Sequence, residues 1–260
     1  MEQTPKFRAR LQRGGLGFHE MRRLLEAYAE HGSFDRLKQQ VFKENLLGKT
    51  SDRILEAMLG AFKWRFLEPL GLPPSGLIAG AMISRMSDAA KTQALFPYFV
   101  ISDPLVEKCY RDLVLVALGS TDANITTKGI VEYLTKLSDS HPELGGWSES
   151  MRSRWAQGFT KLLRDFGLLE RYPQTRLHQL WLLPEAFAFF WLWFFYQTGS
   201  YWETERQGLW ELLQLEAGHR NELLAEGALH GWWHYQRLGE IVQFQPNFSS
   251  TEEWLERGLD

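Results

Sequence analysis

The segment from Ile125 to Leu182 places the strongest constraint on what this chain can fold into. Two amphipathic helical patterns come first, and the second ends at Gly167, a residue type that commonly terminates helices. Two short β-prone runs, 168–171 and 177–182, then follow around a polar turn. Two helices and a β-hairpin in this order are typical of a winged helix-turn-helix, in which the second helix enters the DNA major groove and the hairpin forms the wing.

The second helix of this segment is expected to begin after Ser148, a favourable N-cap residue, and to end at Gly167. Spacings of three and four residues place apolar side chains on one face: Met151, Trp155, Phe159, Leu162 and Phe166. The opposite, polar face is predicted to carry Ser153, Gln157, Thr160 and Arg164, flanked by Arg152, Arg154 and Lys161. Arginine and glutamine can make paired hydrogen bonds to guanine and adenine, and Arg171 and Arg176 of the wing could contact phosphates. The pattern therefore favours DNA binding, although any surface helix turns polar residues outward and many winged helices dock proteins.

Charge is distributed unevenly along the chain. The net charge is −3, but residues 1–65 contain 13 Lys or Arg against 8 Asp or Glu, whereas residues 181–260 contain 4 against 12. Such asymmetry allows one face to approach phosphate. Arg8, Arg10 and Arg13 precede a Gly-Gly pair and resemble a basic arm that could track a phosphate backbone, or simply a solvated terminus. Lys49 and Arg53 flank the expected start of a helix.

Helical patterns dominate the rest of the chain. Residues 1–100 are predicted to form a helical bundle, with helices near 16–31, 34–43, 52–66 and 75–96. Residues 101–260 form the second predicted domain, which begins with a helix over 104–118 capped by Asp103. After the wing we expect a buried helix over Pro184–Thr198, further helices with acidic outer and aromatic inner faces, a short strand and a final helix capped by Ser250 or Thr251. The predicted fold class is mainly α: a helical bundle, then a winged-helix-like domain with a short β-hairpin and C-terminal helices.

Motifs for catalysis are missing from the sequence. There is no phosphate-binding loop, dinucleotide-binding fingerprint, paired cysteine motif or nucleophile elbow. Glu226, His230 and His234 would share a face of a predicted helix at a spacing known from metal sites, but the glutamate that zinc proteases place beside the first histidine is lacking. We therefore interpret these residues as structural and predict a protein that is not an enzyme and that needs no metal or cofactor. The lone Cys109 is expected to be a buried thiol.

Membrane insertion is not predicted. The most apolar run, Phe187–Tyr196, is about half the length needed to span a bilayer. The N-terminus lacks the apolar segment of a signal peptide, and we expect a cytoplasmic protein.

The N-terminal third resembles a known family. FRARLQRGGLGFHEMRRLLEAY, followed by KENLLGKTSDRILEAM, is similar to BrxA, the small accessory protein of bacterial BREX phage-defence systems. The resemblance implies a mostly helical protein whose N-terminal part is similar to the NusB RNA-binding antitermination fold, and it implies binding to double-stranded DNA. Asp52 departs from the more basic run expected after Lys49, which weakens a phosphate clamp there.

These observations lead to one main hypothesis, two alternatives and, last, a metal-dependent enzyme built on His230 and His234. The main hypothesis is a non-enzymatic, double-stranded DNA-binding component of a BREX-type system that has other BREX proteins as partners. The alternatives are an adaptor that docks onto larger defence enzymes, and an RNA-binding protein by the similarity to NusB. The sequence does not specify the oligomeric state.

Overall fold

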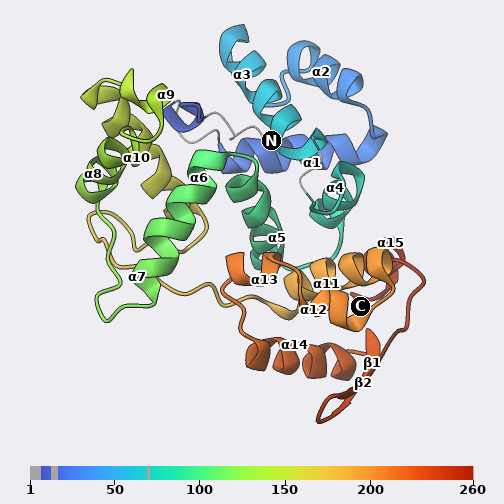
Figure 1. The fold of residues 1–260 in the computed structure, drawn as a ribbon. Helices are drawn as coiled ribbons and strands as arrows, with labels where there is room; N and C mark the ends of the chain where they lie inside the picture. Colours follow the sequence, from blue (N-terminus) through green and yellow to red (C-terminus); the bar gives the residue numbers. More distant parts are fainter. Residues whose placement is uncertain (1–6, 13–16, 69–70, 260) are drawn as a thin grey trace. The chain divides into compact units, whose positions relative to one another are not determined.

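The computed structural model describes residues 7–12, 17–68 and 71–259 and is mainly helical, as predicted (Figure 1). Its contacts group the chain into two compact units. Unit 1 comprises residues 1–21, 47–70 and 98–180, and unit 2 comprises residues 22–46, 71–97 and 181–260. Each unit therefore combines three separate stretches, whereas the sequence alone suggested two consecutive domains. Helices α1 (Phe18–His31) and α5 (Asp88–Ile101) each contribute residues to both units.

Unit 1 contains most of the segment 125–182 that was predicted to form a winged helix-turn-helix. Its elements are η1 (Arg10–Gln12), α3 (Asp52–Phe62), the π-helical η2 (Lys63–Leu67), α6 (Pro104–Cys109), the π-helical η3 (Tyr110–Leu115), α7 (Val116–Leu118), α8 (Thr127–Leu137), α9 (Pro142–Gly145) and α10 (Glu149–Asp165). The expected helix over 104–118 is confirmed as the continuous run α6, η3 and α7. Asp103 caps it, because its carboxylate accepts a hydrogen bond from the backbone N–H of Leu105 at 3.1 Å.

Unit 2 contains most of the aromatic residues. Its elements are α2 (Phe34–Lys43), α4 (Ser75–Ile83), α11 (Pro184–Thr198), α12 (Tyr201–Glu205), α13 (Leu209–Leu212), α14 (Ala217–Leu229), β1 (Trp233–Leu238), β2 (Ile241–Pro246) and α15 (Thr251–Arg257). The apolar run predicted as a buried helix is α11, where Trp191 packs against Trp210 with ring centroids 5.7 Å apart. No helix in the described part of the chain has both the length and the apolar character needed to cross a bilayer.

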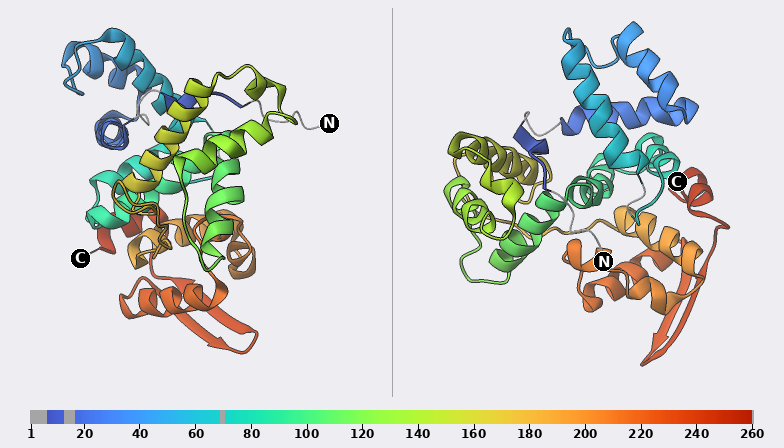
Figure 2. Two further views of the ribbon diagram at one scale, coloured as in Figure 1. Left: turned by 90° about the vertical axis from the view of Figure 1, so that its left-hand side faces the viewer. Right: turned by 45° about the horizontal axis from the view of Figure 1, so that its top comes forward.

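The C-terminal region departs from the prediction in one place. Helix α14 ends at Leu229, and His230 and Gly231 lead into the antiparallel β1–β2 hairpin, which lies beside α14 (Figure 2). The prediction that Glu226, His230 and His234 share one helix face is therefore wrong, because His234 lies in β1. A turn after His230 suits the sequence, since Gly231 adopts a φ of +73° that other residues rarely tolerate. The expected strand near 241–246 and the Ser250-capped final helix are confirmed.

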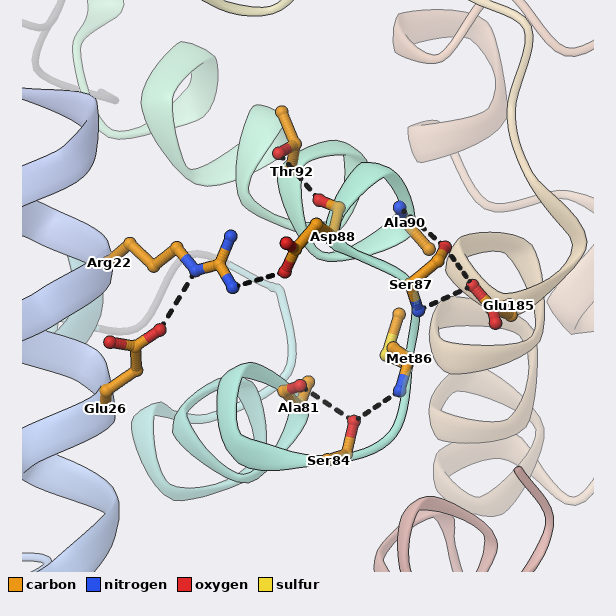
Figure 3. A network of polar contacts seen from close by, with 10 residues as sticks. All are labelled: Arg22, Glu26, Ala81, Ser84, Met86, Ser87, Asp88, Ala90, Thr92 and Glu185. Atoms are coloured by element: carbon orange, nitrogen blue, oxygen red, sulfur yellow. Dashed lines mark hydrogen bonds and ion pairs between the residues drawn. The ribbon is translucent and has the colours of Figure 1, made fainter. Parts of the chain in front are cut away.

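A polar network joins three helices of unit 2 (Figure 3). Arg22 of α1 donates to Asp88 at the start of α5, at 2.6 Å, and to Glu26 one turn along its own helix, at 3.0 Å. On the other side, Glu185 of α11 accepts from the backbone N–H of Ser87 at 3.1 Å. The hydrogen bond and charge of Arg22 lower the pKa of the Asp88 carboxyl. The network fixes the start of α5 relative to α1 and α11.

Candidate nucleic-acid interface

Helix α10 has the cap and the buried stripe that the sequence predicted. Ser148 accepts a hydrogen bond from the backbone N–H of Met151 at 3.2 Å. Trp155 and Phe159 are fully buried and stack with their ring centroids 5.5 Å apart. At the other end, Gly167 has a φ of +73°, and the backbone N–H of Leu168 bonds to the carbonyl of Leu163 at 2.8 Å. This is the glycine-terminated helix end expected from the sequence.

The outward face of α10 is narrower than the pattern suggested. Arg154, Gln157 and Lys161 are exposed, one helical turn apart, whereas Thr160 is only 4% exposed. The hydroxyl of Thr160 donates to the carbonyl of Gln157 at 3.0 Å, so it is occupied within the helix. The reason for the burial is non-local: α8 and η1 both pack against α10 and cover surface that an isolated helix would expose.

Two arginines predicted to reach DNA are instead bonded within unit 1. Arg152 is half-buried and donates through Nη2 to the carbonyl of Leu144 in α9 at 3.1 Å. Arg164 donates through Nε to the carbonyl of Glu170 at 2.9 Å and through Nη2 to the carbonyl of Gln174 at 3.2 Å. These bonds fix the loop before α10 and the turn after it. The guanidinium groups of Arg152 and Arg164 therefore hold neighbouring loops in place and do not project into solvent.

Short extended segments take the place of the predicted wing. Leu169 forms an isolated antiparallel bridge with Leu177, and the backbone N–H of His178 bonds to the carbonyl of Leu168 at 2.9 Å. A third segment lies beside them, because Arg176 also forms a bridge with Asn124, just before α8. The pairing is confined to single bridges within 168–178, so residues 179–182 of the predicted hairpin do not extend it.

The turn between the paired segments presents cationic and aromatic side chains. Arg171 and Arg176 are exposed, as the sequence analysis expected. Tyr172 is 84% exposed and was not predicted as a functional residue. Its position between two arginines in a polar turn, RYPQTR, is a signal that could have identified it.

Only part of the predicted basic arm, Arg8, Arg10 and Arg13, is free to contact DNA. Arg8 is exposed, and Arg13 lies outside the described residues. Arg10 donates to the carbonyl of Ser102 at 2.9 Å, and its guanidinium lies 4.2 Å from the centroid of the Trp64 ring. Arg10 therefore anchors η1 instead of projecting into solvent.

Lys49 and Arg53, the two basic residues expected near the start of α3, also differ in whether they are available to bind DNA. Lys49 forms an ion pair with Glu20 at 2.9 Å, so it has a partner within unit 1. Arg53, in the first turn of α3, is exposed.

A buried arginine was missed entirely by the sequence analysis. Arg65 is 0% exposed, and its guanidinium lies 3.8 Å from the centroid of Phe99 and 4.6 Å from that of Trp64. Its nitrogens have no hydrogen-bond partner among the residues that the structure describes. Burial lowers the pKa of Arg65 to about 9, although the nearby Asp103 opposes the shift. No local pattern distinguishes Arg65 from the exposed Lys63, so its burial could not be predicted from the sequence.

A model of the BrxA family matches residues 5–191, which is well over half of the chain. The chain belongs to the BrxA family. Membership supports a role associated with BREX phage-defence systems. A crystal structure of an uncharacterized protein from Magnetospirillum magneticum has a similar fold: the TM-score is 0.58 at 15% identity, over 78% of this chain and 97% of the other. No curated protein matches the chain significantly.

The BrxA match includes all of α10 and the turn that follows it, but it ends within α11. The β1–β2 hairpin and helices α12 to α15 lie beyond the matched range. Within the described residues, no group of three or more His, Cys, Asp or Glu side chains is placed to hold a metal ion. Cys109 is buried, and burial raises the pKa of its thiol.

Proposed function

We propose that this BrxA-family protein binds double-stranded DNA through the exposed face of α10 and the turn that follows it. The observation that carries the proposal is the double hydrogen bond from Arg164 to the carbonyls of Glu170 and Gln174, which fixes a cationic turn to the end of a helix whose outer face is also cationic. The order of elements supports it: a helix over 104–118, a short extended segment, α8, α10 and two paired segments follow the order of a winged helix-turn-helix.

The exposed side chains suit a duplex. Residues 148–178 contain six Lys or Arg against three Asp or Glu. Arg154 and Gln157 offer donors that can reach base edges in a major groove, while Lys161 is a phosphate contact that would exchange its ion pair with Asp165. Arg171 and Arg176 would contact the backbone beside the groove. With few exposed groups able to read bases, the binding should depend mainly on phosphates and tolerate many sequences.

The test is a fluorescence-anisotropy titration of a labelled duplex at about 50 and 200 mM salt. Three phosphate contacts, from Lys161, Arg171 and Arg176, would give a slope of about −2.7 in log K against log salt, so the affinity should fall by about 40-fold over this range. The variant Arg154→Glu/Lys161→Glu should bind more weakly and with a shallower slope. A control of equal charge, Lys38→Glu/Arg206→Glu, changes exposed residues of unit 2 and should leave the affinity within about twofold.

The other outcomes separate the alternatives. If the helix variant and the control bind equally well, the α10 surface is not the contact. If an RNA duplex displaces the DNA at lower concentration than unlabelled DNA does, the protein is an RNA-binding protein. If the wild type binds neither, co-purification with BREX proteins after nuclease treatment would support the adaptor hypothesis.

A further inference from the structure

Tyr172 occupies an unusual position at the tip of the turn after α10. Its side chain is 84% exposed, although burying an aromatic ring is among the more favourable changes that a side chain can undergo in water. Large exposed apolar groups that project singly are common on proteins. Tyr172 differs from those because its backbone is held in place and two arginines, Arg171 and Arg176, flank it in the turn.

The turn beneath Tyr172 is fixed at three points. The backbone N–H of Gln174 donates to the carbonyl of Arg171 at 3.0 Å and closes the turn. Arg164 bonds to the carbonyls on both sides of the tyrosine, those of Glu170 and Gln174. The ring itself lies within reach of the same guanidinium, whose Cζ is 6.0 Å from the ring centroid. A ring carried on a fixed turn loses little conformational freedom on binding.

The surroundings of the ring indicate what it can bind. Arg171 and Arg176 are exposed on the same turn, and both would be attracted to DNA phosphates. Contacts from these two arginines would place the Tyr172 ring against the interior of a DNA groove. A phosphate offers nothing to an aromatic face, whereas every nucleobase has a flat π-surface. In a regular duplex those surfaces are covered by neighbouring bases, so a ring gains access only where a base step is opened.

We propose that Tyr172 is a stacking site for a nucleobase at an opened or unpaired step of a DNA duplex. The proposal rests on the DNA binding proposed above and adds a ligand preference to it. Positive side chains hold the backbone, and Tyr172 inserts where the stack is already weak. The turn would thereby favour mismatched, bulged or easily unstacked sites over uniform duplex.

The experiment compares two labelled duplexes that differ by a single mismatched base pair, titrated with the full-length protein at one salt concentration. The wild type should bind the mismatched duplex about tenfold more tightly. Tyr172→Ala should abolish that preference, and Tyr172→Phe should retain it because the ring is kept. The salt dependence of Tyr172→Ala should equal that of the wild type, since no phosphate contact is removed.

Because the side chain is exposed, Tyr172→Ala should unfold at the wild-type temperature, and this measurement serves as the folding control. A wild type that binds both duplexes equally would overturn the stacking site while leaving the proposed DNA binding intact. The same conclusion follows if Tyr172→Ala keeps the preference, or if it leaves DNA binding unchanged and instead disrupts association with a BREX protein. A wild type that binds no duplex would overturn both proposals.

Discussion

Replacing Gly158 tests the packing in unit 1, because the sign of the change in unfolding temperature shows whether η1 packs on α10. This glycine lies in α10 where η1 passes over the helix. A Cβ placed on it would lie 2.5 Å from the carbonyl oxygen of Leu11 and 3.0 Å from the Cβ of Leu11. Neither atom can rotate away, because one belongs to the backbone and the other is the first atom of its side chain. Gly158→Ala therefore requires the backbone of η1 to move.

The expected magnitude follows from two opposing effects. In an unobstructed helix interior, replacing glycine by alanine stabilises by about 1 kcal/mol. At position 158 the added methyl overpacks the contact, which costs about 1–3 kcal/mol. If residues 7–12 instead move off the helix, the burial of Phe7 and Leu11 is lost at about 2 kcal/mol each. The steric cost less the helix gain leaves a net loss of up to about 2 kcal/mol, or up to roughly 8 °C in the unfolding temperature.

Thermal unfolding followed by circular dichroism measures this change, and Gly60→Ala is the matched control. Gly60 lies within α3 in the same unit, is exposed, and has no atom within 4 Å of a Cβ placed on it. Its replacement should raise the unfolding temperature slightly. If Gly158→Ala raises the temperature as Gly60→Ala does, then η1 does not pack on α10 at Gly158.

Three further predictions concern buried and paired groups. The lowered pKa of Arg65 means that keeping its side chain charged at neutral pH reduces the stability of the fold by up to about 5 kcal/mol. Its two cation–π contacts offset about 4 kcal/mol of that loss. Arg65→Met should therefore leave the urea midpoint of unfolding unchanged or raise it. A loss of more than about 2 kcal/mol would show that the guanidinium has partners beyond the aromatic rings. The thiol of Cys109 should react with a thiol reagent only in denaturant, because it is buried and its pKa is raised; rapid labelling of the native protein would contradict this. Because Arg22 lowers the folded-state pKa of Asp88 below that of the unfolded chain, this pair stabilises the fold above the unfolded pKa of 3.8 and the stabilisation disappears as the pH falls through the folded value. The difference in urea midpoint between the wild type and Arg22→Gln should therefore shrink between about pH 5 and pH 3, and a difference independent of pH would refute the coupling.

Local sequence signals predicted those parts of unit 1 that depend on local physics. A cap such as Ser148, a terminating glycine such as Gly167 and the apolar stripe between them act within a few residues of one another, and each was found where it was expected. Arg164 could not be assigned in the same way. On a helical wheel Arg164 is an exposed cationic side chain. Its hydrogen-bond partners, the carbonyls of Glu170 and Gln174, lie in the turn that follows the helix and are brought to it only by the fold.

The missed strand β1 has a different cause. HGWWHYQRL is compatible with a helix continuing from α14, and its aromatic residues can be buried in either conformation. The choice is made by β2, which pairs Tyr235 with Phe244 and Arg237 with Val242. A strand whose partner comes later in the chain is selected by that partner rather than by its own residues. The same limit applies to Arg65, since its burial depends on Phe99, more than thirty residues away.

The division of each unit into three stretches has a consequence for how the protein is made. Unit 1 needs residues up to 180, and unit 2 needs the C-terminal residues from 181 onward. A ribosome releases residues 22–46 and 71–97 well before residues 181–260 of the same unit, so these stretches are synthesised before the unit can be completed. Cutting the gene near codon 100 would therefore yield two pieces, neither of which contains a whole unit. Complementation between such pieces, expressed together, would be a more informative experiment than the expression of either alone.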